Sequence, residues 1–162
     1  MNRLDFVLAL GSAVVVALSF AGGLLLAQLF PHASGFEGAL WAGVSGVVVL
    51  QATREKTESA AQLRVVGTLI GAILSGIYLS VASFSVLGLA LCVFVTVLVC
   101  QRIGVPDNAR LASATVVVVM ALSVLHPDMP AFINAGLRFA ESVIGAACAV
   151  LWSLIGRRLR GQ

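Results

Sequence analysis

The sequence predicts an all-α integral membrane protein, a bundle of six transmembrane helices arranged as two inverted three-helix repeats. Hydrophobic residues make up 60% of the 162 residues and charged residues only 10%, whereas a soluble domain averages about 25% charged residues. The apolar runs are too long for the core strands or helices of a soluble protein. In lipid only helices or closed barrels satisfy the backbone, and no run alternates polar and apolar residues as a barrel strand must.

Six apolar segments follow one another, and each is predicted to be a helix. They cover residues 6–30, 38–52, 63–81, 86–101, 111–125 and 132–155. The first is too long for the apolar part of a signal peptide. Small residues recur at every fourth position in several segments, which favours close helix packing in lipid. In the first segment these residues are Ala9, Ala13, Ala17 and Ala21.

The connections between these segments carry most of the polar residues. Residues 31–37 are predicted to form a turn, with Pro31, Ser34 and Gly35 as helix breakers. Residues 53–62 are charged and are predicted to form a loop in water. A tight hairpin is expected at 82–85, a loop at 102–110 and a turn at 126–130.

Six crossings place both termini on the same side of the membrane. Basic residues gather at the connections and termini of that side, whereas the opposite connections hold Glu37 and Asp128 but no Lys or Arg. The positive-inside rule therefore predicts cytoplasmic termini in the cell's inner membrane. Because the basic residues flank apolar segments rather than one soluble face, the net charge of +3 does not predict a nucleic-acid partner.

A weak internal repeat relates the two halves of a single domain, residues 1–162. Arg64-x6-Gly71-Ala72 is matched by Arg138-x6-Gly145-Ala146 at an offset of 74 residues, and the valine-rich parts of segments two and five match at about 70. The repeats are predicted at about 1–81 and 82–162. Three crossings per repeat invert the second copy, and inverted repeats recur in transporters.

Two arginines inside apolar segments are the candidate functional residues. If its helix begins near Thr57, Arg64 lies two turns inside it, roughly 10 Å along the axis, and Arg138 lies at a similar depth in segment six. A cation there is costly unless it meets a partner, a wet cavity or the interface. A guanidinium can bind a carboxylate with two hydrogen bonds. The alternatives are an ion pair with Glu141, a side chain reaching the headgroups, or for Arg64 a positive-inside anchor.

Polar and small residues near these arginines complete the candidate site. Gln51 and Thr68 are expected to contact the substrate or to hydrogen-bond between helices. Gly67, Gly71 and Gly145 are expected to pack helices rather than to bind a ligand. The three cysteines lie in apolar segments and are expected to pack as small hydrophobes. No nucleophile–base arrangement, phosphate-binding loop or metal-ligand spacing is present, so neither an enzyme nor a cofactor is predicted.

The stretch Trp41-Ala42…Val49-x-Gln51…Arg64-x2-Gly67-Thr68-x2-Gly71-Ala72 resembles the fusaric acid resistance and aromatic acid exporter family, which is related to plant aluminium-activated malate transporters. Asn134-x3-Arg138-x6-Gly145 echoes it in segment six. The resemblance implies a six-helix module that moves organic acids outward along a route lined by cationic residues. Many family members join two modules or add a soluble domain, and this chain instead predicts a homo-oligomer, most simply a dimer.

These observations predict a homo-oligomeric transporter or channel that exports organic anions, attracted by Arg64 and Arg138, with Glu141 tuning Arg138. Its partners would be the lipid bilayer and a small organic anion. Two other hypotheses remain open. One is a structural or assembly subunit that transports nothing alone, and the other is a proton or cation pathway through Glu141.

Overall fold

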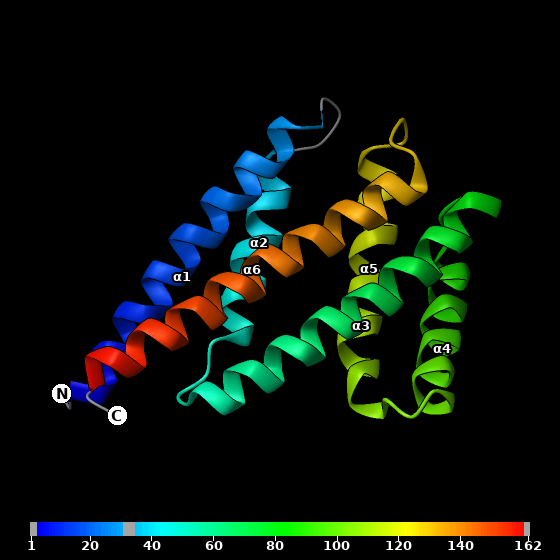
Figure 1. Ribbon diagram of the computed structural model, residues 1–162. Coiled ribbons are helices and arrows are strands. Elements are labelled where there is room, and N and C mark those ends of the chain that lie inside the picture. Colours follow the sequence, from blue (N-terminus) through cyan, green and yellow to red (C-terminus); the bar gives the residue numbers. More distant parts are fainter. Residues whose placement is uncertain (1–2, 31–34, 161–162) are drawn as a thin grey trace. The chain divides into compact units, whose positions relative to one another are not determined.

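In the computed structural model all regular structure among the described residues is helical (Figure 1). The structure describes residues 3–30 and 35–160, with side chains for 6–30 and 35–156. The described helices are α1 (Arg3–Gln28), α2 (Gly35–Val49), α3 (Arg54–Val81), α4 (Val86–Arg102), the short 3₁₀ helix η1 (Pro106–Asn108), α5 (Ala109–Leu125) and α6 (Ala131–Arg160). For these residues the all-α prediction is confirmed.

Four of the described helical stretches are long and apolar enough to cross a membrane. They are 6–28, 54–81, 106–125 and 131–156. The helices α2 and α4 are apolar too but shorter, with 15 and 17 residues. Length and composition therefore indicate a multi-pass membrane protein, because about 20 apolar residues span the hydrocarbon core.

The chain packs as two compact units, and each is described by itself. The first contains residues 1–62 and 141–162, and the second contains residues 63–140. In the first unit α1 and α2 pack side by side (Figure 1). In the second unit α4 packs on α5. The long helices α3 and α6 each contribute one part to the first unit and the other part to the second.

The charged stretch 53–62 is a helix and not the predicted loop. The helix α3 begins at Arg54, and its first turn is capped by Thr53, whose hydroxyl accepts a hydrogen bond from the Lys56 amide at 3.4 Å. Arg54 also pairs with Glu58 one turn later. The charges therefore line an extra N-terminal part of the helix, and Arg64 lies ten residues, about 15 Å, from the helix start rather than 10 Å.

Other helix ends also differ from the predicted boundaries. The helix α2 runs from Gly35 to Val49 instead of 38 to 52, so Gln51 lies beyond its end. Of the predicted turn at 31–37, residues 31–34 lie outside the described residues. The hairpin at 82–85 and the turn at 126–130 are confirmed. The 102–110 connection contains η1, and its Gly104 has φ of +78°, which only glycine adopts readily.

The packing face of α1 is not the predicted alanine stripe. Ala9, Ala13, Ala17 and Ala21 are all exposed. The buried face of the same helix instead carries Gly11, Val15, Ser19 and Gly23. A Cβ added at Gly23 would lie 2.5 Å from Ala39 Cα of α2, so this glycine lets the two backbones meet.

A small apolar core fills the second unit. Cys92 of α4 packs with Val116 and Met120 of α5, and Leu79 and Tyr78 of α3 cover them. Cys100 is also buried, and Cys148 is half-buried; all three thiols are free. The prediction that the cysteines pack as small hydrophobes is therefore confirmed for Cys92 and Cys100.

Candidate functional site

The two candidate arginines and Glu141 are buried inside the protein. The exposed fraction is 3% for Arg64, 2% for Arg138 and 2% for Glu141. The basic residue Arg54, at the start of α3, has by contrast a side chain that is 43% exposed. Neither buried guanidinium therefore reaches out to the headgroups, as a snorkelling arginine would.

A buried asparagine lies beside the backbone at Arg64. The Asn108 side-chain amide, at the junction of η1 and α5, donates a 2.9 Å hydrogen bond to the carbonyl oxygen of Leu63. Asn108 is 5% exposed. This bond joins two segments 45 residues apart at the residue that precedes Arg64, and it thereby fixes the position of α3 against α5.

Gly67 and Gly71 pack α3 directly on α5, and we call this contact the α3–α5 seam. A Cβ at Gly71 would collide with the carbonyl oxygen of Ala112 and lie 2.8 Å from Thr115 Cβ. A Cβ at Gly67 would lie 2.9 Å from Leu111 Cβ. The predicted packing role fits both glycines, because any side chain would force the helices apart.

Gly145 packs α6 on α2 in the same manner, and we call this contact the α6–α2 seam. A Cβ at Gly145 would collide with the carbonyl oxygen of Ala42 and lie 2.7 Å from Ser45 Cβ. One turn before Gly145, the Glu141 carboxyl group lies against Gly38. A Cβ at Gly38 would be 3.1 Å from Glu141 Cδ and in collision with Oε1. The predicted packing role therefore fits Gly145 as well.

Hydroxyl groups also join the two helices of the α6–α2 seam. Ser45 Oγ and Ser142 Oγ lie 3.2 Å apart, and Ser45 Oγ donates to the Trp41 carbonyl at 2.8 Å. Either hydroxyl can donate in the contact between Ser45 and Ser142. This contact between hydroxyl groups therefore helps to hold α2 and α6 together.

The remaining predicted site residues lie in different settings. Thr68 is fully buried in α3, one turn past Arg64 on the same helix. Gln51 is exposed in the connection after α2, and its side-chain amide donates to the Val48 carbonyl at 3.1 Å. Its backbone N–H donates to Thr57 Oγ1 at 3.0 Å, which ties the connection to α3.

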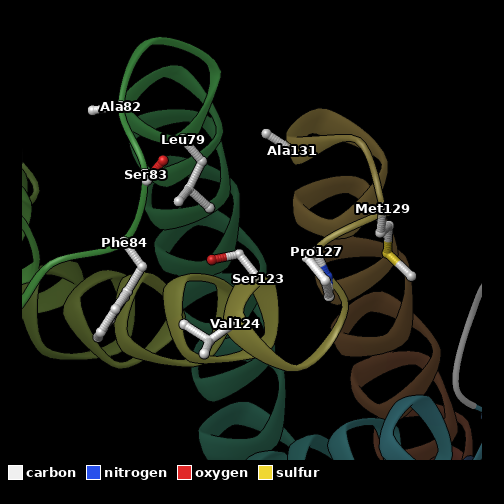
Figure 2. Close-up of a pocket in the computed structure, with 9 residues that line it drawn as sticks. All are labelled: Leu79, Ala82, Ser83, Phe84, Ser123, Val124, Pro127, Met129 and Ala131. Atoms are coloured by element: carbon white, nitrogen blue, oxygen red, sulfur yellow. The ribbon is translucent and has the colours of Figure 1, made fainter.

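A cavity of about 470 Å³ lies in the second unit, at the ends of α3 and α5 (Figure 2). It is lined by Leu79, Ala82, Ser83, Phe84, Ser123, Val124, Pro127, Met129 and Ala131. No charged side chain lines it, so it can take the apolar part of a small molecule but offers no cation to a carboxylate. Among the described side chains, no group of three or more His, Cys, Asp or Glu could hold a metal ion.

Sequence reasoning missed Asn108, Ser45 and Ser142 as polar residues that join helices, and it named Asn134 only as part of the motif in segment six. The Asn134 amide donates to the Val119 carbonyl at 3.0 Å and joins α6 to α5. The predicted repeat offered a signal for Ser142, since the offset that aligns Arg64 with Arg138 also aligns Thr68 with Ser142. Isolated asparagines and serines in apolar segments carry no such signal.

A comparison with known protein families shows which family the chain resembles. Residues 20–152 match the family described as fusaric acid resistance protein-like. The chain belongs to this family. The resemblance expected from Arg64-x2-Gly67-Thr68-x2-Gly71 is therefore confirmed, and the match includes both seams. Comparisons with curated proteins and with solved structures give no match. Membership of the fusaric acid resistance protein-like family, together with the apolar helices, indicates a multi-pass membrane protein with a transport or export role.

Proposed function

We propose that this protein exports organic anions, aromatic acids or other carboxylates, along a pathway lined by Arg64 and Arg138. The observation that carries the proposal is the burial of both guanidinium groups, 3% and 2% exposed, inside helices of membrane-spanning length. Cations are retained in such segments where they serve a substrate or ion pathway or pair with a buried anion. Their forked donors match the two oxygens of a carboxylate.

The second part of the proposal is that six crossings form two inverted repeats. Matched contacts support it. Gly71 meets Ala112 and Thr115 in the α3–α5 seam, and Gly145 meets Ala42 and Ser45 in the α6–α2 seam. The offset of α3 to α6 relates Gly71 to Gly145, and the offset of α2 to α5 relates their partners, Ala42 to Ala112 and Ser45 to Thr115. In this scheme the third helix of each repeat packs on the second helix of the other repeat.

Hydroxyl groups and aromatic residues follow the same offsets. Ser45 Oγ donates to the carbonyl four residues earlier at 2.8 Å, and Thr115 Oγ1 does the same at 3.0 Å. Outside the seams, Gly88 of α4 abuts Tyr78 of α3, and Gly11 of α1 abuts Trp152 of α6. Tyr78 and Trp152 are again related by the α3-to-α6 offset. These contacts support the proposed repeat from outside the two seams as well.

The proposal includes a homo-oligomer, a dimer in its simplest form, in the inner membrane with cytoplasmic termini. The exposed alanine stripe of α1, residues 9, 13, 17 and 21, supports it as a surface on which a second copy can approach closely. Arg64 then lies nearer the cytoplasm and Arg138 nearer the outer face, because the second repeat is inverted.

The proposed pathway is tested by charge reversal. Purified protein is placed in liposomes, and entry of radiolabelled benzoate is measured for Arg64→Glu, Arg138→Glu and the control Arg54→Glu. Benzoate flux should fall to the level of empty liposomes in the first two variants, because a buried carboxylate repels the anion, and should persist in the exposed control. Gel filtration confirms that each variant assembles. Wild-type flux in all three would remove the proposed role of the two arginines, whereas wild-type protein without flux would favour a structural subunit.

A further inference from the structure

The two seams differ at one matched position. In the α3–α5 seam α3 has a glycine and a polar residue lies directly before α5, whereas in the α6–α2 seam α6 has the polar residue and α2 has the glycine. In the α3–α5 seam, Gly67 of α3 lies against Asn108, with a Cβ at Gly67 only 3.2 Å from the Asn108 carbonyl oxygen. In the α6–α2 seam, Glu141 of α6 lies against Gly38 of α2. The two offsets of the repeat pair Gly67 with Glu141 and Asn108 with Gly38.

Each seam therefore holds one polar side chain at this position, but the charge differs. The α3–α5 seam has the neutral amide of Asn108, which donates to the Leu63 carbonyl beside Arg64. The α6–α2 seam has the carboxyl group of Glu141, three residues after Arg138 on α6 and 2% exposed. Gly38 leaves room for the Glu141 carboxyl group, whereas Gly67 lies against the backbone carbonyl oxygen of Asn108.

This difference makes the surroundings of the two arginines unequal. An amide adds no net charge near Arg64, whereas a carboxylate one helical turn from an arginine offsets part of its attraction for an anion. We propose that Glu141 makes the Arg138 end a weaker site for organic carboxylates than the Arg64 end. The anion is thus captured at the Arg64 face and released at the Arg138 face. The inference rests on the proposed function and adds the residue that makes the two faces unequal in affinity.

The test measures the half-saturating benzoate concentration from each face, in right-side-out and inside-out membrane vesicles of the same cells. The wild-type value should be at least about tenfold lower at the Arg64 face, since a factor of ten needs only a small part of a close charge–charge interaction. Glu141→Gln removes the charge and keeps the size. It should bring the two values within about twofold by strengthening the Arg138 face.

A paired exchange keeps the inference testable if the single variant packs poorly. Gly38→Asn with Glu141→Gly rebuilds the α3–α5 pattern in the α6–α2 seam and should equalise the faces as Glu141→Gln does. Glu141→Asp keeps the charge and should keep the difference between the faces. Equal wild-type values, or a difference that survives in a transporting Glu141→Gln protein, would overturn the inference. Failure of the proposed function looks different, because Arg64→Glu and Arg138→Glu would then still transport.

Discussion

At Gly71 and Gly145 a missing side chain lets two helix backbones touch. A Cβ added at Gly71 would collide with the carbonyl oxygen of Ala112, and one added at Gly145 would collide with the carbonyl oxygen of Ala42. Gly136, in the second turn of α6, is a contrasting case, since a Cβ there meets nothing within 4 Å. Replacing each of these three glycines by alanine therefore separates the effect of close packing on stability from the effect of helix propensity.

We expect Gly71→Ala and Gly145→Ala to destabilise the protein by similar amounts, about 1–3 kcal/mol, as overpacking of a tight contact does. Gly136→Ala should leave stability unchanged or raise it by up to about 1 kcal/mol, because alanine favours a helix. Thermal unfolding in detergent measures all three. Equal melting temperatures for Gly71→Ala and Gly136→Ala would contradict the proposed tight seam.

The Asn134 amide makes a second residue-level prediction. It is 2% exposed and bonds to the Val119 carbonyl at 3.0 Å. We expect Asn134→Ala to lower stability by about 1 kcal/mol, in the range of interhelical hydrogen bonds within membranes. A matched truncation at the exposed Asp107, Asp107→Ala, should have no measurable effect. Thermal unfolding in the same detergent gives both values, and indistinguishable values would mean that this bond contributes nothing.

Much of the site was predictable at the level of single residues because charge stands out in an apolar run. Arg64, Arg138 and Glu141 were identified in this way, and their burial agrees with placement inside the protein rather than at its surface. Ser45, Ser142 and Asn108 were not identified. Their importance comes from the helix that they meet, and one-dimensional spacing does not contain that information.

At the scale of elements, α3 corrects the view that charged residues mark a loop. Residues 54–62 are helical because Thr53 caps the first turn and Arg54 pairs with Glu58. Apolar length predicted the membrane part of the helix well. It could not predict the charged start, because a solvated helix end and a charged loop have the same hydropathy.

The connection between α2 and α3 is held by Thr57, which is fully buried. Its hydroxyl accepts from the Gln51 N–H at 3.0 Å and donates to the Thr53 carbonyl at 2.9 Å. We expect Thr57→Val to cost about 1–2 kcal/mol, because the Gln51 N–H loses its partner while the side-chain shape is kept. Thr57→Ser should retain most of the stability. Proteolysis of the connection in detergent reports the local effect, and equal cleavage of Thr57→Val and wild type would contradict it.

At the scale of the whole molecule, hydropathy located every described α-helix, but the shorter helices α2 and α4 leave the number of crossings as a prediction. Single cysteines in a background without Cys92, Cys100 and Cys148 test it. A cysteine at Ser83 should react with an impermeant maleimide from outside, and one at Asp107 only from the cytoplasm. Labelling of both positions from one side would mean that α4 does not cross.

The proposed repeat is the largest feature predicted from the sequence, through Arg64 and Arg138 at corresponding positions of the two halves. The matched contacts of Gly71 and Gly145 extend that similarity to packing. The different placement of the glycine and the polar residue in the two seams could not be predicted. Aligning one half of the sequence with the other shows which positions correspond, but not which helices are in contact.

The central claim, that buried arginines admit organic anions, is tested most directly by charge selectivity of the intact protein. Wild-type proteoliposomes preloaded with unlabelled solute are given either radiolabelled benzoate or radiolabelled tetramethylammonium, and counterflow is followed. The account predicts that benzoate accumulates and tetramethylammonium does not, and that replacing both Arg64 and Arg138 with Gln removes the benzoate signal. Accumulation of the cation, or benzoate counterflow that persists without either arginine, would contradict it.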